Sequence, residues 1–267
     1  MMTPFKYIHE LLGIDTFHNG GIKGNGSVVG ITDSGLDMAH DQFKQSQSVY
    51  NQFNLKARKV VYYETYADAK DQSDQNDRTC GHGTHVCGIL AGNSIDSDAL
   101  GVAPDAQIAF LDIAKDCTLS TCASPIALTI PRTTDALFQN QTKAGAKIIS
   151  YSWGTMSNSG LLASASLDYD DQTRAIDEYL YNNPEVLLIV AAGNGGANGA
   201  KTILSPAGAK NVLTVGASIA DAKTLAFYAN DTQPSDCQDI INEDALTLYS
   251  SLGPTSDGRL KPDLVVP

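Results

Sequence analysis

The chain has 267 residues, of which 42% are hydrophobic and 18% are charged, a balance typical of a soluble globular protein. Its formal net charge of -12 argues against a nucleic-acid partner and against an anionic membrane surface, because both require clustered Lys and Arg. The longest apolar run, residues 186–192, has the length of a strand and is far too short to span a membrane.

Apolar runs of strand length alternate with stretches of helical periodicity along most of the chain. In chain order, strands are predicted over 27–33, 59–63, 106–111, 147–151, 186–192 and 211–215, and helices over 84–90, 133–144 and 170–181. Strands separated by helices indicate βαβ units and a mostly parallel sheet, and fully apolar strands fit a sheet covered on both faces. The polar segment 220–244 is predicted to be a long surface loop. We expect a single domain over 1–267.

The cysteines and glycosylation sequons bear on the compartment. The five cysteines leave at least one thiol without a partner in the chain, and Cys117 and Cys122 form a candidate disulfide. Sequons at Asn25, Asn140 and Asn230 agree with an oxidising compartment. These signals favour an extracellular or endomembrane location, although the N-terminus has no signal-peptide apolar region.

Two polar residues lie where an active site is expected. Asp33 ends the first predicted strand, and the carboxyl ends of parallel strands are where open sheets place their sites. His82 stands between Gly81 and Gly83 at a helix start, where its imidazole can accept a proton while a carboxylate holds the other ring nitrogen. His82 and His85 could instead bind a metal ion, but no carboxylate follows at a metalloprotease spacing.

A third candidate follows the apolar run 186–192. Asn194 lies in the sequence Ala-Ala-Gly-Asn-Gly, and a carboxamide at a strand end can donate to a developing oxyanion, an effect worth about 3 kcal/mol. The small residues Ala192 and Gly193 leave space for a substrate side chain.

The order of these groups resembles that in subtilisin-like serine proteases. The family's acid, base and oxyanion motifs are similar to Asp-Ser-Gly-Leu-Asp at 33–37, Gly-His-Gly-Thr-His-Val at 81–86 and Ala-Ala-Gly-Asn-Gly at 191–195. Further matches are Gly-Val-Ala-Pro at 101–104, Ser-Trp-Gly at 152–154 and the stretch 250–263, so the resemblance extends over about 20–267. The stretches 152–154, 205–217 and 253–259 look closest to the alkaline, oxidant-resistant bacterial branch of the family.

The resemblance implies a fold and an activity. The fold would be a three-layer α/β subtilisin-like domain, with a mostly parallel central sheet and helices on both faces. The activity would be that of a serine-type endopeptidase, acting on protein or peptide substrates. Asp33 would orient His82, His82 would be the general base and then the general acid, and Asn194 would bind the oxyanion.

The resemblance also implies a substrate groove. The main chain of Ser152, Trp153 and Gly154 would pair with an extended peptide as an added strand. Ala192 and Gly193 would line the first specificity pocket.

The nucleophile is the main departure from the family pattern. The family's Gly-Thr-Ser-Met-Ala motif does not occur in the chain, and no helical pattern follows Ser256 to present its hydroxyl. We therefore expect a C-terminally incomplete chain that is inactive alone, with a propeptide in the full precursor. The alternative is a non-catalytic, protease-like peptide-binding domain. A nucleotide-binding protein is disfavoured, because the Gly-rich stretch 20–26 precedes the first strand.

No cofactor is expected for the chemistry, but a structural calcium ion is a candidate. Asp96 and Asp98 lie where the family can carry a calcium loop and could supply oxygen ligands. The carboxylate ligand expected after the Asp33 motif is replaced by Gln42, with Asp41 beside it, so no metal site is assigned.

Overall fold

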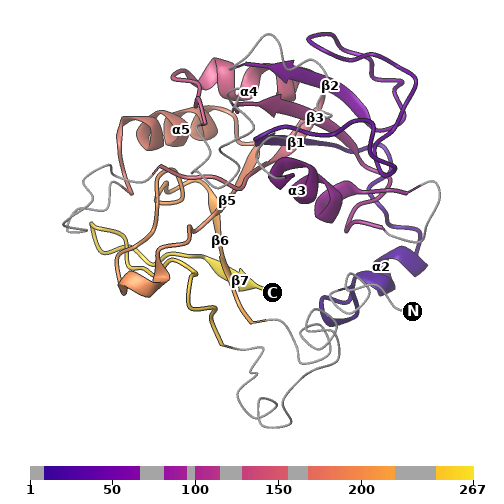
Figure 1. The fold of residues 1–267 in the computed structure, drawn as a ribbon. Helices are drawn as coiled ribbons and strands as arrows, with labels where there is room; N and C mark the ends of the chain where they lie inside the picture. The colour runs from indigo at the N-terminus through magenta and orange to yellow at the C-terminus, as the bar shows by residue number, and fades with distance from the viewer. Residues whose placement is uncertain (1–8, 67–80, 95–99, 115–127, 156–167, 220–244) are drawn as a thin grey trace, which may run out of the picture. The chain divides into compact units, whose positions relative to one another are not determined.

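The computed structural model describes residues 9–66, 81–94, 100–114, 128–155, 168–219 and 245–267 (Figure 1). The chain divides into two compact units, one formed by residues 16–152 and the other by 1–15 and 153–267. Within the described ranges, no helix is long and apolar enough to cross a membrane. The assignment of 1–267 to a single domain stays a prediction.

The unit of residues 16–152 is built on four parallel strands in the order β2-β3-β1-β4. Its elements are β1 (Val28–Asp33), β2 (Val60–Thr65), α3 (His82–Ala91), β3 (Gln107–Asp112), α4 (Thr134–Lys143) and β4 (Ala146–Tyr151). A short helix, α2 (Ile14–Asn19), precedes them. Each strand and both longer helices fall on predicted segments, whereas α2 was not predicted.

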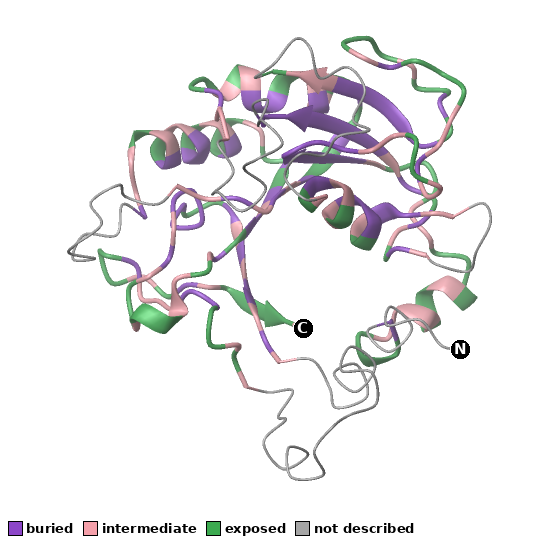
Figure 2. Ribbon diagram, in the orientation of Figure 1, coloured by how far each residue is buried: buried purple, intermediate pink, exposed green. Residues whose placement is uncertain are grey.

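Helices α3 and α4 cover opposite faces of this sheet (Figure 1). On one face, Ile31 belongs to the same buried cluster as Cys87 of α3. On the other face, the amide of Gln141 in α4 donates to the main-chain oxygen of Ile31 at 2.9 Å. Gly30 makes room there, because a Cβ at this position would lie 3.1 Å from the Gln141 side chain. The strands between the helices are buried over most of their length, as the purple ribbons in Figure 2 show.

The second unit has its own parallel strands, in the order β5-β6-β7. Its elements are α5 (Asp171–Asn182), β5 (Leu187–Ala191), a 3-10 helix η2 (Gly196–Asn198), β6 (Leu213–Ala217) and β7 (Leu264–Val266). Helix α5 is fixed to the segment before β6 by buried Asp177, which accepts hydrogen bonds from the main-chain N–H groups of Lys210 (2.9 Å) and Asn211 (2.8 Å).

The structure differs from the predicted elements at β6 and β7. Strand β6 begins at Leu213 instead of residue 211, because residues 211 and 212 still lie in a bend. Strand β7 has only three residues and was not predicted. The predicted loop 220–244 lies outside the described residues.

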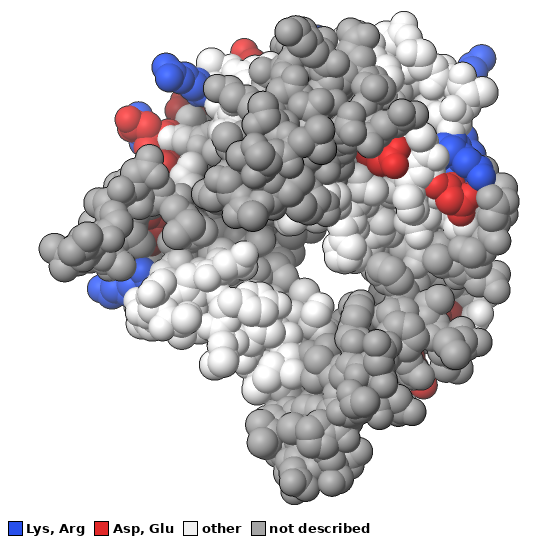
Figure 3. All heavy atoms as spheres, viewed as in Figure 1, with Lys and Arg blue, Asp and Glu red and all other residues white. Residues whose placement is uncertain are grey.

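Charged side chains stand singly or in small groups on the face seen in Figure 3. Ion pairs between near neighbours in sequence include Lys44 with Asp41 (2.9 Å) and Arg174 with Asp171 (3.1 Å).

Candidate active site

Asp33 is the last residue of β1 and is only 2% exposed. Its Oδ1 accepts a hydrogen bond from the main-chain N–H of Ser34 at 2.7 Å and lies 2.7 Å from Nδ1 of His82. Its Oδ2 is buried and has no partner among the described residues. The carboxylate is therefore held in a fixed orientation, with one oxygen aimed at the imidazole.

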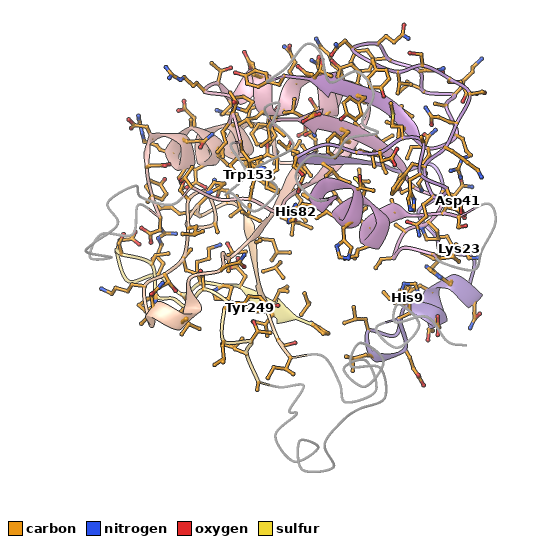
Figure 4. All side chains as sticks on the ribbon, in the orientation of Figure 1. His9, Lys23, Asp41, His82, Trp153 and Tyr249 are labelled. Carbon is orange, nitrogen blue, oxygen red and sulfur yellow. The ribbon has the colours of Figure 1, made fainter. Side chains whose placement is uncertain are left out.

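His82, which is labelled in Figure 4, is the first residue of α3. Its side chain is 46% exposed, whereas that of Asp33 is 3% exposed. A carboxylate can only accept a hydrogen bond, so the contact places a proton on Nδ1 and leaves Nε2 as the basic nitrogen. Gly81 enters the helix with a φ of 81°, a left-handed conformation that suits glycine.

The start of α3 is joined to the loop after β1. The main-chain N–H of Gly83 donates to Oγ of Ser34 at 3.1 Å, and that of Asp37 donates to Oγ1 of Thr84 at 2.9 Å. A Cβ on Gly83 would lie 2.1 Å from the main-chain oxygen of Gly35, so only glycine allows this approach. These contacts fix His82 relative to Asp33, and sequence reasoning had not identified Ser34 or Thr84 as part of the site.

Asn194 lies in the second unit, three residues after β5, and is exposed. The residues on both sides of it are bonded to Ser251. The oxygen of Gly193 accepts from the main-chain N–H of Ser251 at 2.9 Å, and the N–H of Gly195 donates to Oγ of Ser251 at 2.9 Å. Gly193 has a φ of 112°, which favours glycine. The main chain around Asn194 is thus fixed while its side chain faces solvent.

Most of the predicted substrate-binding residues of this unit meet at Leu204. A Cβ on Gly154 would lie 3.0 Å from Cβ of Leu204, and one on Gly193 would lie 2.6 Å from its Cγ. The oxygen of buried Ala192 accepts from the N–H of Leu204 at 3.2 Å. Trp153, which precedes Gly154 in the sequence, is buried, with 7% of its surface exposed.

Ser152 belongs to the other unit, where it directly follows β4. Strand β4 does not continue into residues 152–155. Thr155 nevertheless forms an isolated antiparallel bridge with Ser205, in which the N–H of Thr155 donates to the main-chain oxygen of Ser205 at 2.9 Å.

Ser256 is bonded to a buried carboxylate of its own unit. Its Oγ and its main-chain N–H donate to the two carboxylate oxygens of Asp168, each at 2.6 Å, and Asp168 is 0% exposed. This hydroxyl therefore helps to satisfy a buried carboxyl group.

The calcium candidates Asp96 and Asp98 lie outside the described residues. Among those that are described, no group of three His, Cys, Asp or Glu side chains could hold a metal ion. Asp41, which stands beside the position of the expected ligand Gln42 in the sequence, pairs with Lys44 and accepts from Oγ of Ser94.

The guanidinium of Arg58 bonds to three main-chain oxygens in the same region. It donates to the oxygens of Gln42 (2.8 Å), Lys44 (3.0 Å) and Asn93 (3.2 Å). Partial burial lowers the pKa of Arg58, and the charge of Asp41 opposes that shift. The guanidinium of Arg58 thus already bonds to three main-chain oxygens of this region.

Comparison of the sequence with known proteins identifies one family. Residues 24–267 match the profile of the Subtilase family. The serine protease/ABC transporter B family protein tagD of Dictyostelium discoideum is 33% identical over 307 residues, which covers 92% of this chain and 16% of that protein. The C5a peptidase of Streptococcus pyogenes is 28% identical over 248 residues, which covers 83% of this chain and 20% of that protein. The chain thus spans a small part of these relatives.

Comparison with solved structures shows the fold. The psychrophilic subtilisin-like protease Apa1 from Pseudoalteromonas sp. AS-11 matches with a TM-score of 0.53 and 21% identity, over 80% of this chain and 41% of that chain. The Clostridium perfringens CspB protease matches with a TM-score of 0.58 and 14% identity, over 95% and 78%. The predicted three-layer α/β subtilisin-like fold is therefore confirmed.

Proposed function

Because the chain belongs to the subtilase family, we propose that its protein is a serine endopeptidase of the subtilisin type that hydrolyses peptide bonds in proteins. The observation that carries the proposal is the 2.7 Å contact between Nδ1 of His82 and Oδ1 of Asp33. A half-exposed imidazole held by a buried carboxylate is the arrangement that a general base of this kind requires. The names of the relatives, serine protease and C5a peptidase, support the same activity.

In the proposed reaction, Nε2 of His82 removes the proton of a serine hydroxyl as its oxygen attacks the scissile carbonyl carbon. The carbonyl oxygen becomes an oxyanion, to which the amide of Asn194 donates a hydrogen bond. His82 then gives its proton to the leaving amine, and an acyl-enzyme forms. Water attacks this ester with His82 again as the base, which frees the acid product and the serine. Asp33 stabilises the imidazolium at each stage.

The substrate is proposed to bind as an extended peptide along the main chain of Ser152, Trp153 and Gly154. Ala192 and Gly193 would line the pocket for the side chain that precedes the scissile bond. The shared contacts of Gly154 and Gly193 with Leu204 support this part of the proposal, because they bring the two segments together. The stretches 152–154, 205–217 and 253–259 favour the alkaline, oxidant-resistant bacterial branch of the family.

The nucleophile is proposed to lie outside these 267 residues, so the 267-residue chain alone would be inactive. Two observations support this: Gly-Thr-Ser-Met-Ala does not occur in the sequence, and the hydroxyl of Ser256 is bonded to Asp168. A propeptide in the full precursor belongs to the same proposal. So does a structural calcium ion at Asp96 and Asp98, which a chelator-induced fall in the melting temperature of the full-length protein would support.

The test is carried out on the full-length gene product, with a fluorophosphonate probe and a fluorogenic peptide. We expect the wild-type protein to be labelled at a serine and to cleave the peptide, and His82→Ala to lose both reactions. His85→Ala is the matched control, because His85 is an exposed histidine one turn further along α3. If the wild-type protein bound peptides but was neither labelled nor active, the alternative of a non-catalytic peptide-binding domain would replace the proposal.

A further inference from the structure

A second buried carboxylate lies beside Asp33. Strands β1 and β3 pair in parallel, and their last residues, Asp33 and Asp112, are partners in the register. Register partners on neighbouring strands point to the same face of a sheet. Asp112 is 3% exposed and Asp33 is 2% exposed, so the two carboxylates are buried next to each other. Such an arrangement is costly unless each carboxylate receives hydrogen bonds.

The carboxylate of Asp112 receives a hydrogen bond at each oxygen. Its Oδ2 accepts from the hydroxyl of Tyr63 at 2.8 Å, and its Oδ1 accepts from the main-chain N–H of Ala114 at 3.0 Å. Tyr63 lies on β2 and is 0% exposed, and its ring stacks on Phe110 with centroids 5.3 Å apart. Its hydroxyl is therefore held by packing as well as by the hydrogen bond.

The same hydroxyl reaches the loop that follows Asp33. The main-chain N–H of Leu36 donates to Oη of Tyr63 at 3.4 Å, a long hydrogen bond. Since the carboxylate of Asp112 can only accept, the hydroxyl of Tyr63 donates its hydrogen bond to Asp112 and turns its oxygen lone pairs toward Leu36. Asp112 thus sets the direction in which Tyr63 can accept.

Leu36 belongs to the loop that orients both members of the Asp33–His82 pair. Ser34 in this loop donates to Asp33 and accepts from the N–H beside His82, and Asp37 donates to Thr84 of α3. A shift of the loop would therefore change the geometry of the imidazole and of its carboxylate together.

We propose that Tyr63 and Asp112 are positioning residues of the peptidase reaction, which hold the loop 34–37, and through it His82, in the orientation that proton transfer requires. This inference rests on the proposed function. It assigns no contact with the substrate to either residue, so their loss is expected to lower kcat and to leave KM nearly unchanged.

The experiment measures kcat and KM of the full-length protein with the variants Tyr63→Phe and Asp112→Asn. We expect Tyr63→Phe to lower kcat by about tenfold, since displacements of up to about 1 Å near reacting groups cost up to about 10²-fold. Asp112→Asn retains an oxygen that can accept from Tyr63, so a smaller loss is expected. The double variant should lose no more than Tyr63→Phe alone, because both changes act through one contact.

The matched control is Tyr62→Phe, which removes a hydroxyl from the neighbouring residue of the same strand. Tyr62 is also buried, but it packs with Val61 and Ala109 in a separate cluster and stacks on Phe53. We expect this variant to keep its kcat. The low-field proton NMR signal of the His82 Nδ1–H group should shift in Tyr63→Phe and stay in place in Tyr62→Phe.

The inference would be overturned if the wild-type protein were active and His82→Ala inactive, yet Tyr63→Phe kept the wild-type kcat or raised KM instead. Losses that add in the double variant would also overturn it. An inactive wild-type protein, or an active His82→Ala, would instead refute the proposed function itself, so the two failures are distinguishable.

Discussion

Gly83 lies where α3 packs against the loop after β1, and its replacement by alanine tests the geometry of the site. The new Cβ would lie 2.1 Å from the main-chain oxygen of Gly35, well inside the 3.0 Å below which a Cβ does not approach a non-bonded heavy atom. The first turn of α3 and the loop must then separate by about 1 Å, which lengthens the hydrogen bond between Gly83 and Ser34. Such overpacking destabilises proteins by about 1–3 kcal/mol.

His82 begins the turn that must move, so the displacement acts on the contact with Asp33. A misplacement of about 1 Å at a reacting group can cost about 10²-fold in rate, and we expect kcat of the full-length Gly83→Ala protein to fall by that order. The rate of hydrolysis of a fluorogenic peptide at saturating concentration gives kcat. Thermal melting followed by circular dichroism confirms that the variant is folded.

Gly88→Ala is the matched control, since Gly88 is a second buried glycine of α3. There the new Cβ would lie 3.0 Å from Oε1 of Gln42, the end of a flexible side chain that can move aside. If Gly83→Ala kept the wild-type kcat while folded, or if Gly88→Ala lost as much, the reasoning would be refuted.

Two further predictions concern a buried amine and the amide of Asn194. Burial lowers the pKa of Lys59 from its ordinary 10.5 to about 8, so the unfolded state binds the proton more tightly and stability should rise with pH between these values. Urea unfolding of the full-length protein at pH values below and above that window should show this rise in stability. The rise should disappear in Lys59→Met. It should persist in the control Lys56→Met, because Lys56 is exposed in the same loop. Asn194→Ala should lower kcat by about 10²–10³-fold with little change in KM, as loss of an oxyanion donor does. The exposed Asn198→Ala is its control, and equal kcat values for the two variants would contradict the assigned role.

Local signals in the sequence account for much of the fold. Helix α4 begins where Thr133 accepts a hydrogen bond from the N–H of Ala136 at 3.3 Å, and Gly145 follows its end with a φ of 101°. Both residues are recognisable helix boundary signals, so this helix was predicted almost to the residue. Strand β7, by contrast, has three residues whose strand conformation depends on pairing with β6.

The immediate partners of the site were harder to predict. Asp33 and His82 could be identified because each lies in a local motif, and the resemblance to a known family ordered them. The pairing of Asp33 with Asp112 depends instead on the register of two strands that are far apart in sequence. No local pattern around Tyr63 indicates that its hydroxyl will reach both Asp112 and Leu36, since this contact is created by packing. Ser251 escaped notice for the same reason.

The measurement that tests the central claim most directly is kcat of the full-length Asp33→Asn protein. Asparagine keeps the size of the side chain at this buried position but can donate to Nδ1, which favours the wrong imidazole tautomer. We predict a loss of about 10⁴-fold in kcat at neutral pH with the protein still folded, as is found when the acid of such a triad is replaced in this way. A folded Asp33→Asn protein with nearly the wild-type kcat would contradict the assignment of Asp33 and His82 as the acid and base of the reaction.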